Sequence, residues 1–191
     1  MSLVLSMLGS DQNLDPGSTP TFVGVKNTAN IGTANTGTTA VEYGDGYHHQ
    51  TILTVNTTLP SIAGGAALGV GKLIYTFPAG AVVVHASYKS IAITQTQGHI
   101  NANTPDVALG TTIASGVIST LTTSSFKNLS AATLSADCTG TANVDTVGED
   151  VAIEVGDNHT VYINVAATWA ASGDTAALLT GTVVIEWVFM N

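Results

Sequence analysis

The sequence contains no arginine and only four lysines among its 191 residues, whereas 13 residues are acidic, so the formal net charge is −9. Binding to nucleic acid requires clusters of lysine and arginine that neutralise phosphate groups. No segment supplies such a cluster, and we therefore exclude nucleic acid as a partner. The lack of arginine also removes the forked side chain that commonly holds phosphates and carboxylates.

Charge of either sign is scarce, since charged residues make up 9% of the chain against about 25% in ordinary globular proteins. The single cysteine, Cys138, excludes an intrachain disulfide and is interpreted as a small buried apolar residue. No run approaches the about 20 apolar residues that span a bilayer, and the start "MSLVLSMLGS" lacks a basic leader region. We expect a soluble protein without an export signal or a membrane partner.

Turn-forming residues dominate the first 40 positions, as in "GSDQNLDPGSTP" and "NTANIGTANTGTTA". The sequence predicts an N-terminal arm or linker over residues 1–40, in which only "TFVGVK" has the character of a strand. Such an arm could lie along a neighbouring subunit or could simply be a flexible terminus. Residues 41–191 are predicted to form one domain, because a chain of this length can bury a single core.

From Val41 onward, short runs typical of β-strands are separated by Gly, Pro, Asn and Asp. No window of ten residues keeps the period of 3.6 that a helix requires, and "AASGDTAALL" is at most a short helix or a loop. About eight strands with regular turns predict an all-β fold, an antiparallel β-sandwich of jelly-roll type. No repeat of fixed period is present, which argues against a propeller or a β-helix.

Three segments give specific expectations for side chains. In "KSIAITQTQ", Ile91 and Ile93 are predicted to point inward, and in "GKLIYTFPAG" one face carries Leu73, Tyr75 and Phe77. The segment "EDVAIEVGDNHTVYINVAATW" predicts a hairpin, because "GDNH" favours a tight turn between two alternating runs. Its facing side chains would be Val151, Ile153 and Val155 against Val161, Ile163 and Val165.

The closing strand "LTGTVVIEWVFMN" alternates clearly. Its core face is predicted to carry Val183, Ile185, Trp187 and Phe189. The other face, with Val184, Val188 and Met190, is also half apolar. Two explanations stay open: the strand is central in a sheet covered on both sides, or another subunit covers its outer face.

His48 and His49, close to Glu42 and Asp45, form the best candidate for a metal cluster. Adjacent residues on a strand point to opposite faces, so both imidazoles cannot easily reach one ion. The pair also departs from the His-x-His spacing of metal-binding cupins, and we interpret it as a polar loop that leads into a strand. A calcium site at Asp145, Glu149, Asp150 and Glu154 is disfavoured, because no Asp-x-Asp-x-Asp-Gly loop is present.

Catalytic patterns are also missing. "GGAALGVGK" has the wrong spacing for a phosphate-binding loop, and of the carboxylates only Glu186 lies in the middle of a firm strand. We therefore predict no enzymatic activity, no catalytic or metal-binding residues and no cofactor. The alternative in this class is an enzyme with a metal held by His48, His49 and the strand residue His85.

Five stretches in order carry a resemblance: "VEYGDGYHHQTILTV", "GKLIYTFPAGAVVVHASYKSIAIT", "TPDVALGTTIASGV", "VYINVAATW" and "GTVVIEW". Over Val41 to Asn191 the chain resembles the capsid decoration, or cement, proteins of tailed bacteriophages. The resemblance implies a jelly-roll-like virion structural protein, made in the host bacterial cytoplasm and seated on the capsid surface. It also implies two kinds of partner: the major capsid protein and further copies of the chain, as a homotrimer.

The alternative within the binding class is a receptor-binding or carbohydrate-binding module of a phage tail or fibre. Sugars usually stack on exposed aromatic rings, and aromatic residues make up only 6% of this chain. Trp169 in "AATWAASG" is the best candidate for such stacking. We interpret Trp169 instead as a residue that caps the core.

Overall fold

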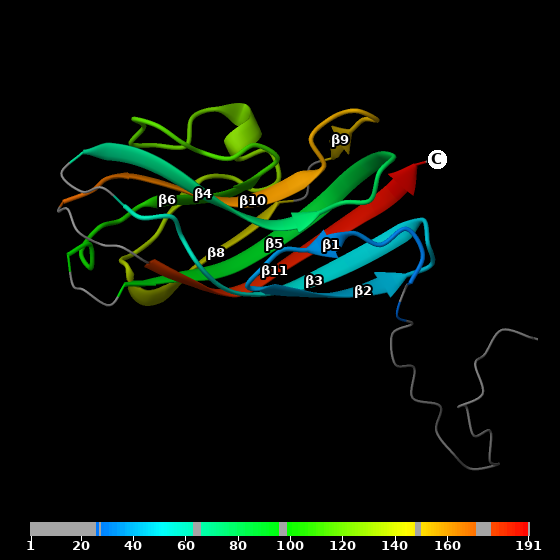
Figure 1. Cartoon of the computed structure of the whole chain (residues 1–191), viewed down its shortest axis with the longest axis horizontal. Coiled ribbons are helices and arrows are strands. Elements are labelled where there is room, and N and C mark those ends of the chain that lie inside the picture. Colours follow the sequence, from blue (N-terminus) through cyan, green and yellow to red (C-terminus); the bar gives the residue numbers. More distant parts are fainter. Residues whose placement is uncertain are drawn as a thin grey trace, which may run out of the picture.

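Two antiparallel sheets packed face to face form the protein (Figure 1). The computed structural model describes Lys26 and residues 28–62, 66–95, 99–147, 150–170 and 177–190. The five-stranded sheet has the order β1 (Thr33–Ala34), β4 (Ala67–Thr76), β10 (Thr160–Thr168), β6 (Asp106–Gly110), β7 (Thr133–Leu134). The other sheet has the order β2 (Thr38–Gly44), β3 (His48–Thr58), β11 (Ala177–Met190), β5 (Ala81–Gln95), β8 (Thr139–Val147), and β9 (Val151–Ile153) pairs with β5.

The predicted fold class, an antiparallel β-sandwich, is confirmed, and its topology is compatible with a jelly roll. The described residues form eleven strands, more than the about eight expected, and eight of the eleven have five or more residues. The short helical element η1 (Ser124–Phe126) is a single 3₁₀ turn. No helix in the described segments has the length and apolar character needed to cross a membrane.

The core lies between the two sheets and is built from alternate residues of their strands. In β11 the predicted core residues Val183, Ile185, Trp187 and Phe189 are all buried, and in β5 so are Ile91 and Ile93. β11 lies at the centre of its sheet, hydrogen-bonded to β3 on one side and to β5 on the other. Its position explains why the sequence of this strand is so apolar.

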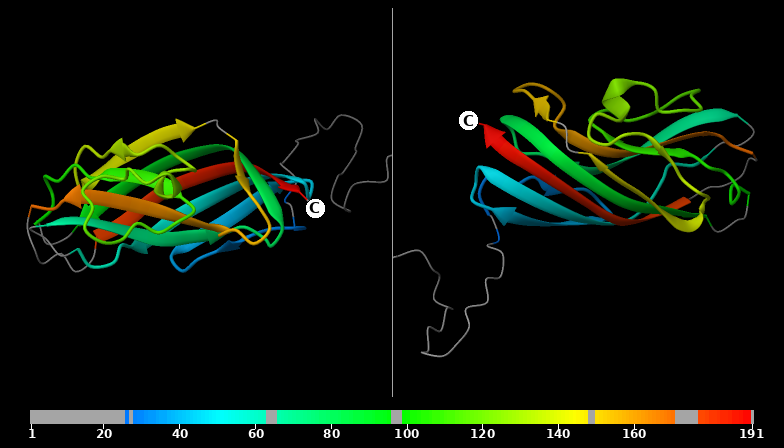
Figure 2. Two further views of the ribbon diagram at one scale, coloured as in Figure 1. Left: turned by 90° about the horizontal axis from the view of Figure 1, so that it is seen from above. Right: turned by 180° about the vertical axis from the view of Figure 1, so that it is seen from behind.

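The outer side of the five-stranded sheet is covered by the chain between β6 and β8 (Figure 2). Asn164 of β10 has no exposed surface, and its side chain holds this layer in place. Its amide nitrogen donates to the carbonyl oxygens of Thr112 (2.9 Å) and Phe126 (2.8 Å), and its Oδ1 accepts from the Ala114 N–H (2.8 Å). A second apolar cluster lies beneath the layer, formed by Ala108, Ala114, Leu121 and Ala166.

The outer side of the six-stranded sheet has no such layer among the described residues. The outward side chains of β11 are half-buried or exposed: Val184 and Val188 are half-buried, and Met190 is 50% exposed. β11 is therefore central in its sheet, but the described residues do not cover the sheet on its outer side. The explanation of a central strand in a sheet covered on both sides thus holds only for the position of the strand.

The predicted hairpin over residues 151–165 is wrong. β9 pairs with β5 in the six-stranded sheet, whereas β10 pairs with β4 and β6 in the other sheet. The connection between β9 and β10 therefore crosses from one sheet to the other. Val155, which was expected to face the second run of the hairpin, is 77% exposed in this crossing.

The predicted boundary between arm and domain, at residues 40 and 41, falls inside β2. Thr33–Ala34 pairs with β4, and Thr38–Gly44 pairs with β3, so the sandwich begins before Val41. The abundance of threonine in "TTAVEYG" favours a strand, and the turn residues around it obscured this signal. Residues 1–25, with most of "TFVGVK", lie outside the described residues.

Two smaller expectations also need correction. Ile74 is fully buried and takes the core position expected for Leu73, because the register shifts between Val161 and Tyr162 of β10. The segment "AASGDTAALL" was expected to be a short helix or a loop, but its last three residues, from Ala177, begin β11. Its earlier residues, 171–176, lie outside the described residues.

Candidate functional site

A pocket of about 400 Å³ lies at one end of the six-stranded sheet. It forms where the turn between β2 and β3 meets the beginning of β5 and the end of β11. The residues that line it include His48, His49, His85, Glu186 and Trp187. The structure therefore brings all three histidines of the alternative metal hypothesis to one place.

The β2–β3 turn is fixed by the side chain of Asp45. Its Oδ1 accepts hydrogen bonds from the backbone N–H groups of His48 (2.8 Å) and Tyr47 (2.9 Å). These two bonds, that of His48 first, lower the pKa of the Asp45 carboxyl from 3.8 to about 2. Gly44, with φ +137°, allows the turn, because a Cβ there would lie 1.8 Å from the His48 carbonyl oxygen.

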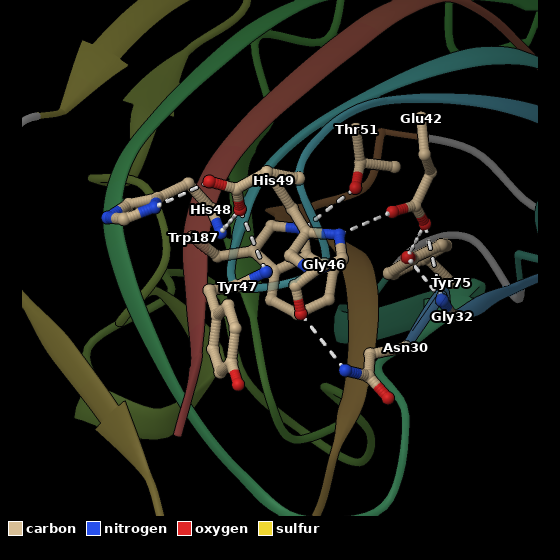
Figure 3. A network of polar contacts seen from close by, with 11 residues as sticks. Asn30, Gly32, Glu42, Gly46, Tyr47, His48, His49, Thr51, Tyr75 and Trp187 are labelled. Carbon is tan, nitrogen blue, oxygen red and sulfur yellow. Dashed lines mark hydrogen bonds and ion pairs between the residues drawn. The ribbon is translucent and has the colours of Figure 1, made fainter. Parts of the chain in front are cut away.

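A buried polar network lies beside this turn (Figure 3). Oε1 of Glu42, which is 8% exposed, accepts hydrogen bonds from the Tyr75 hydroxyl and from the backbone N–H of Gly32 (3.2 Å). Oε2 of Glu42 lies 3.2 Å from Nδ1 of His49. Because Tyr75 belongs to β4, Glu42 ties the two sheets together at this end.

Burial raises the pKa of the Tyr75 hydroxyl far above its ordinary value, and the hydrogen bond to Glu42 adds to the effect. Tyr75 therefore remains a proton donor over the whole range in which the protein would be studied. Because Glu42 is buried, its side-chain oxygens require hydrogen-bond donors from the protein, and the protonated Tyr75 hydroxyl is one of them.

His49 and Trp187 form the wall between the pocket and the core. Their rings are stacked, with centroids 3.8 Å apart and planes within 10°. Trp187 donates from Nε1 to Oγ1 of Thr51 (2.8 Å), and the edge of Phe77 packs against its ring. The imidazole of His49 exposes no surface, so it is packed as part of the sheet.

His85 reaches the pocket because of a β-bulge. The register between β5 and β11 shifts at Glu186 and Trp187, which pair with Ala86 and Val84, so His85 is the extra residue. Its side chain is 47% exposed, and Nδ1 lies 2.7 Å from Oδ1 of Asp150. His85 is thus a strand residue whose imidazole is hydrogen-bonded to a carboxylate.

The three histidines do not converge on one point, because each contacts a different carboxylate. The pairs are His48 with Asp45, His49 with Glu42, and His85 with Asp150. The side chains of His48 and His49 are 75% and 0% exposed, which confirms that they point to opposite faces. Across the described parts of the chain, no three His, Cys, Asp or Glu residues are arranged to hold a metal ion.

The acids considered for calcium are also dispersed. Asp145 lies 3.8 Å from the amine of Lys89, Asp150 contacts His85, and Glu154 is exposed in the crossing after β9. Glu149 lies outside the described residues. Glu186 accepts a hydrogen bond from Gln50 (3.2 Å) on the outer face of the sheet.

Trp169, the candidate for stacking on a sugar, is only 1% exposed, and its Nε1 donates to the carbonyl oxygen of Leu68 (2.9 Å). The interpretation of Trp169 as a cap of the core is confirmed. Cys138 is fully buried, as expected. A tryptophan in this position presents no ring face to a ligand, so it gives no support to a carbohydrate site.

Replacing Glu42 with alanine should lower the free energy of unfolding by about 1–3 kcal/mol, because the buried Tyr75 hydroxyl would lose its acceptor. The Gly32 N–H would keep its hydrogen bond to the Tyr75 oxygen (3.0 Å). Urea denaturation followed by tryptophan fluorescence measures the loss. Glu186→Ala removes an exposed carboxylate from the same sheet and should change stability by less than about 0.5 kcal/mol. Equal losses in the two variants would contradict the role of Glu42.

No protein-family model matches the sequence, and no curated protein matches it either.

Proposed function

We propose that this chain is a virion structural protein that binds the outside of a tailed-phage capsid and stabilises the shell without catalysis. The observation that carries the proposal is the open outer face of the six-stranded sheet. A sheet face that is both broad and poor in charge is typical of a surface that another protein covers.

Strand register defines this face. One row across four strands consists of Val41, Ile52, Val184 and Tyr88. The next row consists of Thr39, Thr54, Thr182 and Ser90. Among the described outward side chains of β2, β3, β11, β5 and β8, only Glu186 carries a formal charge. The face therefore offers apolar and hydroxyl groups, whose desolvation costs far less than that of charged groups.

The proposed partners are further copies of the chain, as a homotrimer, and the major capsid protein. Many modest contacts repeated over a shell produce strong attachment through multivalency. The net charge of −9 would favour a basic surface on the capsid and would contribute mainly to steering and specificity. The resemblance to capsid decoration proteins supports the same assignment.

The proposal predicts that Val184→Glu prevents attachment. A charge placed at the centre of the outer face would have to be buried in the interface, and the amount of protein that sediments with the phage particles should fall at least about tenfold. The measurement is a density gradient of particles mixed with tagged protein, with the mass of each variant in solution determined in parallel.

Val155→Glu is the matched control, because Val155 is exposed in the crossing between β9 and β10, away from the outer face. This variant should bind as the unchanged chain does. A full chain that is monomeric and absent from purified particles would overturn the proposal. Unchanged binding of Val184→Glu would show that the outer face is not the surface involved.

A further inference from the structure

Lys89 lies on the inner side of β5 and its side chain has no exposed surface. The amine Nζ donates to Oδ1 of Asn143 (2.7 Å) and to Oγ1 of Thr133 (2.7 Å), and it lies 3.8 Å from Oδ2 of Asp145. Asn143 and Asp145 belong to β8, where Asp145 pairs directly with Lys89. A buried amine thus faces an amide and a carboxylate on the neighbouring strand.

The amide of Asn143 is held in one orientation. Its Nδ2 donates to the carbonyl oxygens of Thr133 (3.2 Å) and Leu134 (3.0 Å), so Oδ1 must face the amine. The hydroxyl of Thr133 also donates to Oδ1 (2.9 Å). A carbonyl bond is about 1.2 Å long, so the amide carbon lies within about 4 Å of Nζ, close to the separation at which a reaction can start.

We propose that Lys89 and Asn143 react with each other to form an amide bond between their side chains. The neutral amine of Lys89 attacks Cγ of Asn143, and a new C–N bond forms. The bond from Cγ to Nδ2 then breaks, and the nitrogen leaves as ammonia. No oxidant, reductant or further reactant is needed, because the amine and the carboxamide give one amide and one molecule of NH₃.

Each neighbouring group has a role in this reaction. Asp145, whose Oδ2 accepts no hydrogen bond from the described residues, takes the proton that Nζ loses and returns it to the departing nitrogen. The Thr133 hydroxyl stabilises the negative charge that develops on Oδ1. The two carbonyl oxygens on Nδ2 receive the N–H groups of the leaving ammonia. Burial also lowers the pKa of Lys89 from 10.5 to about 8, so neutral amine is present near neutral pH.

The bond would join β5 to β8, which lies at the edge of the six-stranded sheet. An edge strand has no neighbour on one side and is held by a single ladder of hydrogen bonds. A covalent link at this position would prevent β8 from separating from the sheet. The inference does not depend on the proposed function, since it rests only on groups inside the sandwich.

The mass of the purified, denatured full chain tests the inference. The expected mass is about 17 Da, one ammonia, below the mass calculated from the sequence. A measured mass equal to the mass calculated from the sequence would overturn the proposal. In Lys89→Met the loss should disappear, whereas in Lys72→Met, a matched change on β4, it should persist.

Digestion with trypsin locates the bond. It also distinguishes the cross-link from cyclisation of an asparagine, a reaction that loses ammonia too. The chain has only the four lysines Lys26, Lys72, Lys89 and Lys127 as cleavage sites. A linked Lys89 resists cleavage, so residues 73–127 should remain joined to residues 128–191 in one branched product. Separate peptides 73–89 and 128–191 would overturn the proposal even if ammonia had been lost.

Asp145→Asn keeps the amine and the amide but removes the proton carrier. This variant should retain the full sequence mass, and its circular dichroism should show that the sheets still form. Bond formation at an unchanged rate in Asp145→Asn would overturn the role of the carboxylate. The variant also covers the case in which Lys89→Met fails to fold.

Discussion

Alanine in place of Gly181 should prevent stable folding, with a loss of about 4 kcal/mol or more in the free energy of unfolding. Gly181 lies in β11 between Val55 of β3 and Ile91 of β5, with φ +146°. A Cβ at this position would lie 1.9 Å from the carbonyl oxygen of Ser90. Because that oxygen belongs to the backbone of β5, the strands themselves would have to separate.

Gly156→Ala is the matched control for this result. Gly156 also has a positive φ, +95°, but a Cβ there would meet no atom within 4 Å. Its cost is that of the backbone conformation alone, about 1–2 kcal/mol. Thermal unfolding and the soluble yield of both variants distinguish the two cases. Equal losses would show that the positive φ matters and the contact with Ser90 does not.

Trp187→Ala should lower the free energy of unfolding by about 3–5 kcal/mol, the usual range for a large aromatic residue removed from a core. The indole is only 1% exposed and contacts His49, Phe77 and Thr51 at the end of the sandwich. The variant would leave a cavity there and remove the donor from Thr51. Urea denaturation followed by far-UV circular dichroism measures the change without depending on the lost fluorophore.

Two further variants separate the causes of that loss. Trp187→Phe keeps a ring against His49 but cannot donate to Thr51, so it should cost less than the alanine variant. Met190→Ala changes an exposed residue of the same strand and should stay within about 0.5 kcal/mol of the unchanged chain. A loss below about 1 kcal/mol in Trp187→Ala would contradict the central position of this side chain in the core.

The burial of strand residues could be predicted from the sequence where alternation is strong. The pattern in β11 placed Val183, Ile185 and Trp187 in the core, and the pattern in β5 placed Ile91 and Ile93 there. Alternation works here because a strand has only two sides and one of them must be buried. These strands are also long, which makes the pattern hard to mistake.

Strand pairing could not be predicted in the same way. The turn "GDNH" and the alternating runs around it suit a hairpin, yet β9 and β10 enter different sheets. Local sequence determines which side of a strand is apolar, whereas its neighbours are determined by strands far away in the chain. For β10 these neighbours are β4 and β6, and no feature of residues 151–165 identifies them.

In the candidate site, too, local features could be predicted from the sequence and long-range contacts could not. The opposite orientations of His48 and His49 follow from their being adjacent on a strand, and the structure agrees. The contact between Glu42 and Tyr75 joins residues 33 positions apart in different sheets. The bulge at His85 and the burial of Lys89 likewise depend on strands that pair with β5. The positions of these four residues, Glu42, Tyr75, His85 and Lys89, depend on strands that are distant in the sequence, so the local pattern could not predict them.

The placement of β11 between β3 and β5 has a consequence for how the chain folds. The contact between Thr51 and Trp187 spans 136 residues, and the six-stranded sheet cannot close until β11 has been synthesised. Proteins with so many long-range pairings fold slowly, over milliseconds to seconds. Until β11 has been synthesised, β3 and β5 each present an unpaired strand edge. A truncated chain that lacks β11 would keep these edges and would be prone to aggregation in the cell.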